Sequence, residues 1–560
     1  MKKKYSIGVD YGTNSVRALV IDITNGQELG VQTYNYPGGE EGIILDSKNP
    51  HVARQSPDDY LAGLEASVLG ALKKAERIKN FRREEVIGIG VDTTGSTPIP
   101  VTKEGTPLSF LPEFRSNINA LAWLWKDHTA MEEAAEITLL AKKLKKPYLG
   151  KCGGTYSSEW FFSKILHCLR TDPKVFAAAF SWVELCDYIP AVLTGNTDPI
   201  TLKRSVCAAG HKAMFNLSWG GLPSKEFLKK LDPQLAKLRD RLYDEAFPGG
   251  VKMGRLSPRW AEIFGLSTEV AVSVGAFDAH MGAVGAGIKP GRLVKIIGTS
   301  TCDTIVAAKA SKLKDVKGIC GIVNGSILPG YYGLEAGQSA VGDIFNWFVE
   351  FMGDKSLHEI YTKAAEKLNP GETGLMALDW NNGNRTVLVD PKLTGLLLGM
   401  TLHTKPYEVY KALIEATAFG AKVIIDRFEE YGVKVLEVVN CGGIAKKNPL
   451  LMQIYADILN RPMKLSRSAE TCALGAALFG SVAAGAVNGG YDRTETAQKN
   501  ITGLKALVYL PNLKNAVVYA RLFKIYKQLH DGFGTKNCSK MNTVMKELLE
   551  IKQQATQAKC

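Results

Sequence analysis

The chain has 560 residues, of which 45% are hydrophobic and 22% charged, and a formal net charge of +13. A chain of this length exceeds what one hydrophobic core supports, so two or three globular domains are expected. Lysine and arginine are spread along the chain and mixed with acidic residues, with no basic block interleaved with aromatic residues. This distribution argues against nucleic-acid binding, and a positive field that attracts anionic nucleotides accounts for the charge equally well.

The cysteines and the uncharged stretches of the chain indicate the cellular compartment in which the protein is expected. The ten cysteines form no C-x-x-C pair, which argues against a disulfide framework and a cysteine-based zinc site and favours a reducing, cytoplasmic compartment. The uncharged stretch 471–491 is built from glycine and alanine, and Gly475, Gly480 and Gly485 interrupt it. It predicts a tightly packed internal helix and no membrane association.

The opening stretch, residues 7–20, consists of an apolar run, a Gly-Thr-Asn-Ser turn at 12–15 and a second apolar run. This order predicts a β-hairpin with its turn exposed. The backbone of Gly12 and the small polar side chains of the turn suit phosphate oxygens, and Asp10 at the strand end suits a hydrated Mg²⁺. An ordinary hairpin with a polar turn is the alternative that these residues alone leave open.

The next segments predict the start of an α/β sheet. A strand-like run at 31–34 precedes a helix that begins at Ser56, where a capping serine, a proline and two acidic residues stand together. The apolar run 86–91 predicts a buried strand that ends in the small polar loop 92–98. Because α/β proteins bind ligands at the carboxyl ends of strands, this loop is a candidate substrate site, with a plain connecting loop as the alternative.

After a long mixed middle section, the second half of the chain repeats the pattern of the first. The strand-like run 270–277 delivers Asp278 at its end, and residues 295–306 again form a strand, a Gly-Thr turn and a strand. Gly298 and Thr299 follow Gly12 and Thr13 by about half the chain length. We interpret this repeat as two similar lobes whose hairpins clamp a polyphosphate from both sides, with chance similarity of two short turns as the alternative.

A further glycine-rich corner lies near residue 440. The strand-like run 435–441 meets Gly442 and Gly443, and Asn448 then opens a helix. Because glycine has no Cβ, this corner lets the flat ring of an adenosine lie against the backbone. The last fifty residues predict one or two amphipathic, lysine-rich helices. The chain contains no G-x-x-x-x-G-K-[ST], H-E-x-x-H or G-x-S-x-G motif, so a phosphate-handling enzyme here uses something other than a P-loop.

With these features the chain resembles the FGGY carbohydrate kinases, which belong to the actin-like ATPase fold superfamily, over about residues 5–490. The segments 395–400 and 408–415 are similar to the C-terminal signature of the family. Within the family the chain is most similar to kinases that act on ribulose, in the segments 92–98, 125–128, 157–160, 210–214 and 337–343. The resemblance implies an α/β fold of two ribonuclease H-like lobes, residues 1–288 and 289–560, with mixed sheets flanked by helices and with ATP and sugar in the cleft between them.

The resemblance also implies ATP-dependent phosphorylation of the terminal O5 hydroxyl of ribulose to ribulose 5-phosphate, as a step of L-arabinose catabolism. Asp278 is expected to act as the base that takes the proton of O5, and Asp10 to bind Mg²⁺ through water. The expected sugar contacts are Ser96, Trp125, Lys212, Asp278 and Glu335. The expected contacts to ATP are Gly12, Thr13, Asn14, Ser15, Arg17, Gly298, Thr299, Gly337, Gln338, Gly442, Gly443 and Asn448.

Two other functions stay open at this point. Another kinase of the same family, acting on xylulose or a related ketose or polyol, would share the chemistry and differ in substrate. An actin-like ATPase that serves as a chaperone or a filament subunit would share the hairpins but would need neither the loop 92–98 nor a base such as Asp278. The expected partners are a ketopentose and ATP, with no nucleic acid and no membrane, and the oligomeric state is open, a homodimer included.

Overall fold

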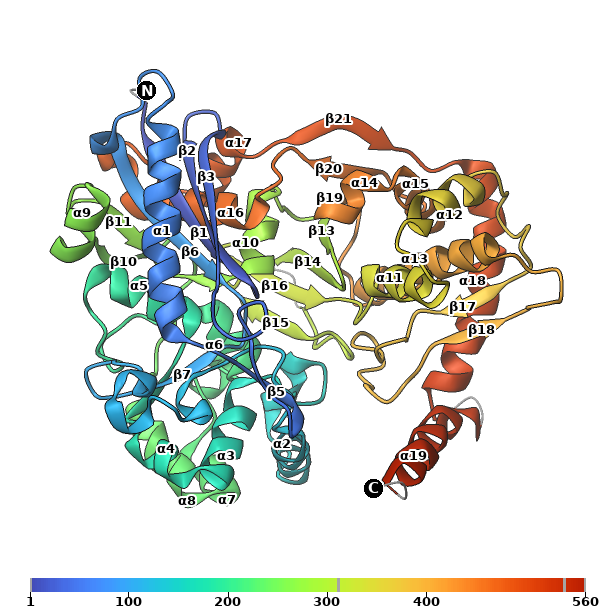
Figure 1. The fold of residues 1–560 in the computed structure, drawn as a ribbon, viewed down its shortest axis with the longest axis horizontal. Coiled ribbons are helices and arrows are strands. Elements are labelled where there is room, and N and C mark those ends of the chain that lie inside the picture. The colour runs from blue at the N-terminus through green and yellow to red at the C-terminus, as the bar shows by residue number, and fades with distance from the viewer. Residues whose placement is uncertain (1–2, 310–312, 537–539, 558–560) are drawn as a thin grey trace.

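The computed structural model describes residues 3–309, 313–536 and 540–557. Two lobes lie side by side, each built around a seven-stranded mixed sheet with helices on its faces (Figure 1). The first sheet contains β1 (Tyr5–Tyr11), β2 (Ser15–Asp22), β3 (Gln27–Asn35), β6 (Val86–Thr93), β10 (Lys252–Arg255), β11 (Ala271–Ser273) and β12 (Ala276–Phe277). The second contains β13 (Arg292–Ile297), β14 (Thr301–Ala308), β15 (Gly321–Asn324), β16 (Tyr331–Ala336), β19 (Glu437–Cys441), β20 (Met463–Ser466) and β21 (Leu504–Tyr509).

The two sheets share one topology. In the first, β1 lies between antiparallel β2 and parallel β6, and in the second, β13 lies between antiparallel β14 and parallel β19. The correspondence continues outward, because β3 and β16 pair antiparallel with the second hairpin strand, and β11 and β20 pair parallel on the opposite side. The two Gly-Thr turns therefore occupy the same position in two similar lobes, and the prediction of a repeat is confirmed.

The glycine- and alanine-rich stretch forms α16 (Thr471–Ala484), which packs against β1, β6 and α10 (Asp278–Gly285) of the first lobe. Glycine is required at this contact. A Cβ on Gly8 would stand 1.8 Å from the carbonyl oxygen of Ala473, and a Cβ on Gly90 would stand 1.8 Å from that of Ala476. The predicted internal helix is thus confirmed. None of the helices in the described ranges is both long and apolar enough to span a bilayer.

Two long helices stabilise the lobes. In the first, α1 (Pro57–Ala75) begins after Ser56, whose side chain accepts a hydrogen bond from the Asp58 amide, and packs on β2 and β3. In the second, α13 (Pro406–Glu430) is buried over most of its length. Its neighbours include α11 (Gly342–Phe351), α12 (Leu357–Ala365), α15 (Pro449–Leu459), α18 (Leu513–Gly534) and the hairpin β17 (Met376–Leu378) to β18 (Leu396–Leu398). The predicted C-terminal helices are α18 and α19 (Val544–Gln557).

The middle section adds a helical layer to the first lobe, drawn in cyan and green below the sheet in Figure 1. Its tryptophans mostly pack in a core, where Trp123 and Trp182 meet edge to face at 6.2 Å. The small sheets flanking it contain β4 (Ile44–Asp46), β5 (Asn49–Gln55) and β8 (Ala122–Trp123), and β7 (Pro98–Val101) and β9 (Ser181–Glu184). The helices of this layer are α2 (Met131–Lys143), α3 (Phe161–Thr171), α4 (Pro173–Ala178), α6 (Val206–Lys212), α7 (Lys225–Leu231) and α8 (Pro233–Leu238). Two further helices, α5 (Leu185–Thr194) and α9 (Pro258–Phe264), pack with the core of the first sheet.

Candidate active site

The two Gly-Thr turns leave open space beside their glycines. The amide of Gly12 donates to the Ser15 carbonyl at 2.9 Å, and that of Gly298 donates to the Ser300 carbonyl at 3.0 Å, so both amides close their own turns. A Cβ on Gly12 would meet its nearest neighbouring atom at 3.4 Å, and one on Gly298 at 4.0 Å. The space beside each glycine is therefore open, but both glycine amides are engaged within their turns and are not free to donate to a phosphate oxygen in this structure.

Side chains of the first turn are tied to neighbouring loops. The indole N–H of Trp125 donates to Thr13 Oγ1 at 3.1 Å, and Gln55 Nε2 donates to the Thr13 carbonyl at 2.6 Å. Asn14 Nδ2 donates to the Glu41 carbonyl at 2.7 Å. Trp125, which the sequence assigns to the sugar, thus also contacts the expected phosphate hairpin.

Three carboxylates gather where strands of the first sheet end. Asp10 on β1 pairs in register with Asp92 on β6, and Asp278 begins α10 directly after β12. Burial raises the pKa of Asp10, and burial together with the Asp10 charge raises the pKa of Asp92 well above its ordinary range. Burial and then the charge of Asp10 raise the pKa of Asp278 to about 7. Because crowded, poorly solvated carboxylates repel one another, this corner favours binding of a cation.

Asp10 and Asp92 have the right chemistry for Mg²⁺. Together with Cys472 they place one potential ligand atom each within 4.8 Å of one another. Both carboxylate oxygens of Asp92 are buried and have no hydrogen-bond partner among the described residues. Carboxylate oxygens are hard ligands that suit Mg²⁺, whereas the Cys472 thiol does not. Arg17, an expected phosphate contact, lies 3.7 Å from Asp10 and 2.7 Å from Glu470.

The polar loop 92–98 is fixed by hydrogen bonds to two buried side chains, Glu184 and Lys164. Ser96 Oγ donates a hydrogen bond to Glu184, and the Thr97 amide donates to the same carboxylate at 2.7 Å. Lys164 Nζ donates to the carbonyl oxygens of Ser96 at 2.9 Å and Leu124 at 2.7 Å. The Ser96 hydroxyl proton is therefore committed to Glu184, and the whole residue is buried in this structure.

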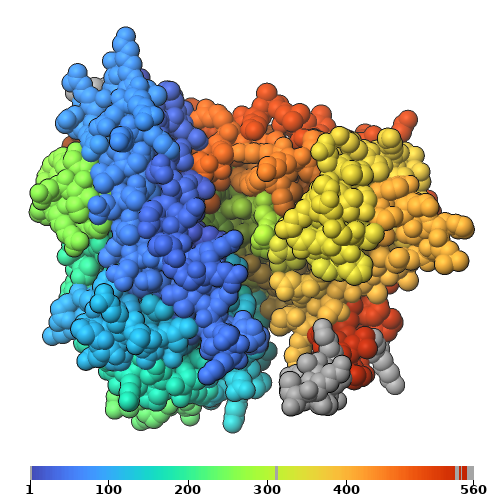
Figure 2. Space-filling view, viewed as in Figure 1, coloured from blue at the N-terminus to red at the C-terminus, as the bar shows by residue number. Residues whose placement is uncertain are grey.

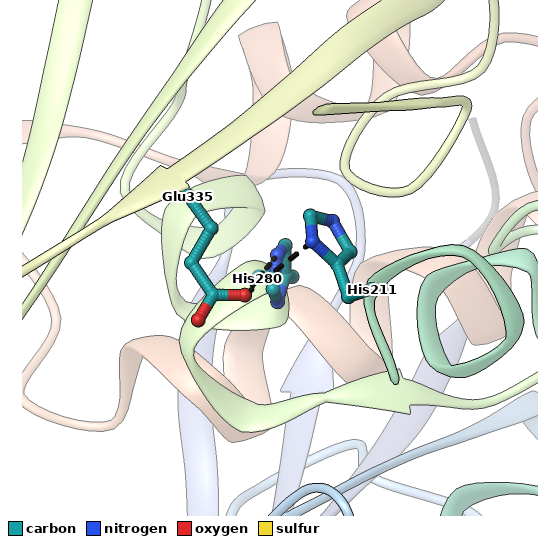
Figure 3. A group of neighbouring side chains, drawn as sticks. All are labelled: His211, His280 and Glu335. Carbon is teal, nitrogen blue, oxygen red and sulfur yellow. Dashed lines mark ion pairs between the residues drawn. The ribbon is translucent and has the colours of Figure 1, made fainter. Parts of the chain in front are cut away.

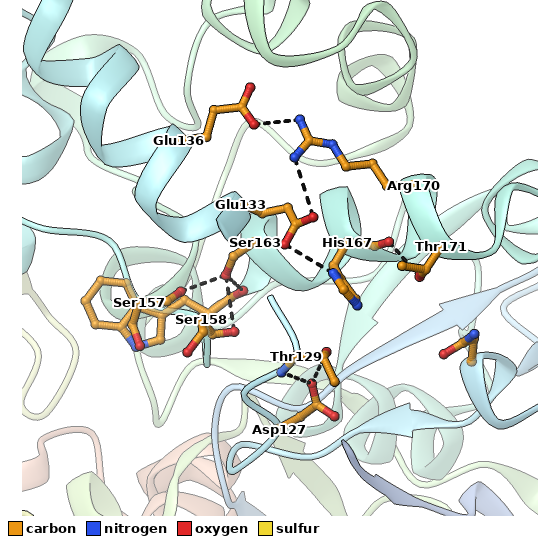
Figure 4. Close-up of polar contacts among 12 residues, drawn as sticks. Asp127, Thr129, Glu133, Glu136, Ser157, Ser158, Ser163, His167, Arg170 and Thr171 are labelled. Carbon is orange, nitrogen blue, oxygen red and sulfur yellow. Dashed lines mark hydrogen bonds and ion pairs between the residues drawn. The ribbon is translucent and has the colours of Figure 1, made fainter. Parts of the chain in front are cut away.

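The neighbouring segment that presents Trp125 is fixed in the same way. Asp127 Oδ1 accepts hydrogen bonds from the backbone and hydroxyl of Thr129 at 3.2 and 2.5 Å, and Asp127 Oδ2 forms an ion pair with buried Arg54 (Figure 4). Ser163 Oγ contacts the Ser157 carbonyl at 2.7 Å. Buried polar contacts thus set the backbone on this side of the site before any ligand binds.

Lys212 and Glu335, both expected sugar contacts, meet across the two lobes. Lys212 ends α6 of the first lobe and Glu335 lies on β16 of the second, with 3.4 Å between Nζ and Oε1. Arg385 joins the same oxygen at 2.9 Å. Burial alone would raise the pKa of Glu335, but the charge of Lys212 and its cationic neighbours outweighs burial and holds this pKa far below its ordinary range. Charges of Glu335 and Lys212 also act on Asp278, so this group borders the carboxylate corner.

In the expected adenosine corner, two glycines pack closely against backbone atoms and a third faces open space. Gly442 has φ +95°, and a Cβ there would stand 2.2 Å from the Ile297 carbonyl, while a Cβ on Gly337 would stand 2.1 Å from the Thr301 carbonyl. Gly443, by contrast, faces open space. The side chain of Asn448 caps α15 by accepting the Leu451 amide at 2.9 Å. Gly443 is thus the position in this corner with room for a ring.

Gln338 is occupied by protein contacts. Its Nε2 donates to Asp379 at 2.7 Å and to the Thr417 carbonyl at 2.8 Å, and its Oε1 accepts from Lys295 at 3.0 Å. Tyr526 on α18 donates its hydroxyl to the same Asp379 at 2.7 Å. Helix α18 is therefore linked to β13 of the second sheet through Asp379, Gln338 and Lys295. These contacts hold the Gln338 side chain in the interior of the second lobe.

The sequence pattern by itself assigns no individual role to several residues of this site. Asp92 could have been assigned to the metal, because its strand ends beside that of Asp10 in a parallel sheet. Lys164 and Glu184 lie in an ordinary helix and strand, and Arg385 lies in a loop far from the other residues in sequence. Their contacts arise only when distant segments pack together.

The site lies between the lobes. The space-filling view shows a hollow between the blue and cyan first lobe and the orange and yellow second lobe, with green parts of the chain at its floor (Figure 2). The carboxylate corner belongs to the first lobe, Glu335 and Arg385 to the second, and Lys212 bridges them.

Family comparison agrees with this arrangement. The N-terminal domain of the FGGY family of carbohydrate kinases matches residues 5–285, and the C-terminal domain of that family matches residues 293–484. The chain belongs to the FGGY family of carbohydrate kinases. Membership in this kinase family implies the use of ATP, and it agrees with the two-lobed α/β fold.

Individual relatives cover the whole chain. The chain is 42% identical over 570 residues to a ribulokinase of Shouchella clausii, and the match covers 99% of each chain. It is 40% identical to a ribulokinase of Vibrio parahaemolyticus, and that match covers 94% of this chain and 95% of the other. The fold is similar to a crystal structure of xylulose kinase from Rhodospirillum rubrum, with a TM-score of 0.77, 21% identity and coverage of 94% and 98%. A second xylulose kinase structure, from Brucella ovis, gives a TM-score of 0.78 at 20% identity.

Proposed function

We propose that this FGGY kinase transfers the γ-phosphoryl group of ATP to the O5 hydroxyl of ribulose and forms ribulose 5-phosphate. The observation that carries the proposal is the buried Asp278 carboxylate at the start of α10. The charges of Asp10, Glu335 and Lys212 all act on this carboxylate, so it lies within electrostatic reach of both the acidic corner and the Lys212–Glu335 pair. The full-length similarity to ribulokinases supports ribulose as the sugar.

A sugar hydroxyl is a weak nucleophile, so the reaction needs a base within hydrogen-bond reach. Asp278 is the proposed base, because a carboxylate whose pKa lies at about 7 binds a proton more readily than an ordinary aspartate and still ionises near neutral pH. It would accept the O5 proton as O5 approaches the γ-phosphorus. Lys212 and Glu335 offer the donors and acceptors that the remaining hydroxyls need.

Phosphoryl transfer otherwise requires positioning and charge neutralisation. The turns at Thr13 and Thr299 would hold the phosphates from the two lobes, and Gly443 would face the adenosine. Asp10 and Asp92 would hold Mg²⁺, which neutralises phosphate charge when bound. Closure of the lobes on both substrates would exclude water, which otherwise competes with the sugar for the phosphoryl group.

A substrate panel tests this proposal directly. ADP release is measured with Mg²⁺ and ATP in the presence of L-ribulose, D-ribulose, xylulose enantiomers, glycerol and no sugar. We expect the highest kcat/KM with one ribulose enantiomer. A higher kcat/KM with xylulose would overturn the assignment of the sugar but keep the chemistry. ATP turnover independent of every sugar would overturn the kinase assignment and support an actin-like ATPase.

A further inference from the structure

A second group of potential metal ligands lies at the boundary between the lobes. His211 comes from α6, His280 from α10 and Glu335 from β16, and all three side chains are buried (Figure 3). Figure 3 shows both imidazole rings turned toward one carboxylate oxygen. Two of these residues belong to the part of the chain that matches the N-terminal family domain, and Glu335 belongs to the part that matches the C-terminal domain.

The separations suit a single tetrahedral ion. Glu335 Oε2 lies 3.5 Å from His211 Nδ1 and 3.6 Å from His280 Nε2, and all three ligand atoms lie within 4.8 Å of one another. Ligand atoms about 2.1 Å from a tetrahedral Zn²⁺ stand roughly 3.4 Å apart. The two separations between the carboxylate oxygen and the imidazole nitrogens are thus close to those of an occupied site.

One tautomer of His211 leaves a lone pair facing the carboxylate. It forms when the Ser326 hydroxyl donates its proton to the Val323 carbonyl at 3.2 Å, since the serine oxygen then accepts at the 3.0 Å contact with His211 Nε2. Nδ1 of a neutral His211 then carries no proton and points at an oxygen that also carries lone pairs. A metal-bound histidine has this arrangement, with its distal N–H held by a neighbouring acceptor.

Among the described residues, the neighbouring cations donate to the other oxygen of Glu335. Lys212 and Arg385 both donate to the other carboxylate oxygen, Oε1, at 3.4 and 2.9 Å. Among the described residues, Glu335 Oε2, His211 Nδ1 and both ring nitrogens of His280 have no hydrogen-bond partner. Burial lowers the pKa of His211 well below its ordinary value and that of His280 to about 4, so both imidazoles are neutral.

We propose that His211 Nδ1, His280 Nε2 and Glu335 Oε2 bind one divalent transition-metal ion of the Zn²⁺ type, separate from the Mg²⁺ of the nucleotide. Two imidazoles and one carboxylate favour Zn²⁺ or Co²⁺, whereas the all-oxygen pair Asp10 and Asp92 favours Mg²⁺. The ion links the two lobes beside the proposed sugar pocket and fixes the orientation of Glu335. The positive charges of Lys212 and Arg385 oppose it, so moderate affinity and loss of the ion in acid are expected.

Cobalt binding to the full-length protein tests the site without reference to kinase activity. The protein is treated with a chelator, desalted and titrated with Co²⁺ while its visible and near-ultraviolet absorption is recorded. We expect saturation at one equivalent with tetrahedral visible bands and no thiolate charge-transfer band. No saturable binding, or a thiolate band that would place the ion at Cys472, overturns the proposal.

Matched variants locate the ion. His280→Gln should abolish the cobalt bands, whereas His167→Gln, at another histidine that contacts a glutamate and lies outside the site (Figure 4), should retain them. Ser326→Ala keeps all three ligands and removes the acceptor of the His211 N–H, so about 10- to 100-fold weaker binding is expected. Circular dichroism establishes that each variant is folded. Undiminished binding by folded His280→Gln overturns the proposal, as does undiminished binding by Ser326→Ala if His280→Gln is unfolded.

Discussion

The two Gly-Thr hairpins have the same backbone setting but different side chains. Two residues before the turn glycine, the first hairpin has Asp10 and the second has Ile296. Asp10 is flanked by Arg17 on the antiparallel strand and Asp92 on the parallel strand. Ile296 is flanked at the same positions by Cys302 and Cys441. The same three strand positions therefore carry two aspartates and an arginine in the first lobe, and an isoleucine and two cysteines in the second.

This difference indicates a division of chemical roles. The first lobe accumulates acids whose pKa values are raised chiefly by burial and, for Asp92 and Asp278, also by the charge of Asp10, which is unfavourable for folding but useful for binding Mg²⁺ and moving a proton. The second lobe keeps the turn but has uncharged side chains at the corresponding strand positions. The predictions below test whether the acids alone distinguish the two lobes.

The largest effect is expected for Asp278→Asn. The amide keeps the shape but cannot take the O5 proton, so kcat should fall by about 10²- to 10⁴-fold, with nucleotide affinity retained. Steady-state ADP release and calorimetric ATP binding measure the two quantities. Asp426→Asn, in a helical pair with Lys422 on α13, serves as the control with unchanged kcat. Near-normal turnover of Asp278→Asn would rule out the base.

The same substitution should change stability in a pH-dependent way. The pKa of Asp278 is raised in the folded protein to about 7, so its favourable contribution is complete below the unfolded pKa and is lost as pH rises through about 7. At pH 8, Asp278→Asn should therefore be more stable than the parent by on the order of a few kcal/mol. Near pH 4 the difference should vanish. Chemical unfolding across this range measures it, and a gap that grows toward acid would contradict the sign.

An intermediate effect is expected for Asp92→Asn. The neutral amide removes one negative charge beside Asp10, so half-maximal activity should need about 10- to 100-fold more Mg²⁺. The matched variant in the second lobe is Cys441→Ala, since Cys441 occupies the equivalent register position. Mg²⁺ titrations of both variants give the comparison. Equal shifts in the two would mean that the lobes do not divide the roles as inferred.

The smallest effect is expected for Trp125→Phe. The change removes the indole donor to Thr13 Oγ1 and keeps an aromatic ring, and a lost neutral hydrogen bond costs about 0.5–1.5 kcal/mol. If Trp125 serves the phosphate hairpin, KM for ATP should rise a few-fold while KM for ribulose changes less. A rise confined to the sugar KM would instead assign Trp125 to the sugar alone.

Local patterns predicted much of the fold. Both hairpins, the helix after Ser56 and the internal glycine-rich helix follow from short-range features such as apolar runs, turn residues and caps. The contacts of Ser96 with Glu184 and of Gln338 with Asp379 and Lys295 could not be foreseen, because they join segments that are distant in sequence. The sequence assigned Gln338 to the nucleotide, and this assignment stays a prediction, while the structure shows that the side chain is hydrogen-bonded inside the second lobe.

The sequence by itself determined the repeated strand–turn–strand units, the acidic end of the first sheet and the family, because these depend on residues that are neighbours in the chain. Tertiary structure alone decided that Asp10 and Asp92 lie side by side, that Lys212 meets Glu335 across the lobes, and that His211, His280 and Glu335 converge. Burial and proximity set the charge states of these groups, and both arise only when segments that are distant in sequence pack together, within the first sheet for Asp10 and Asp92 and between the lobes for the others.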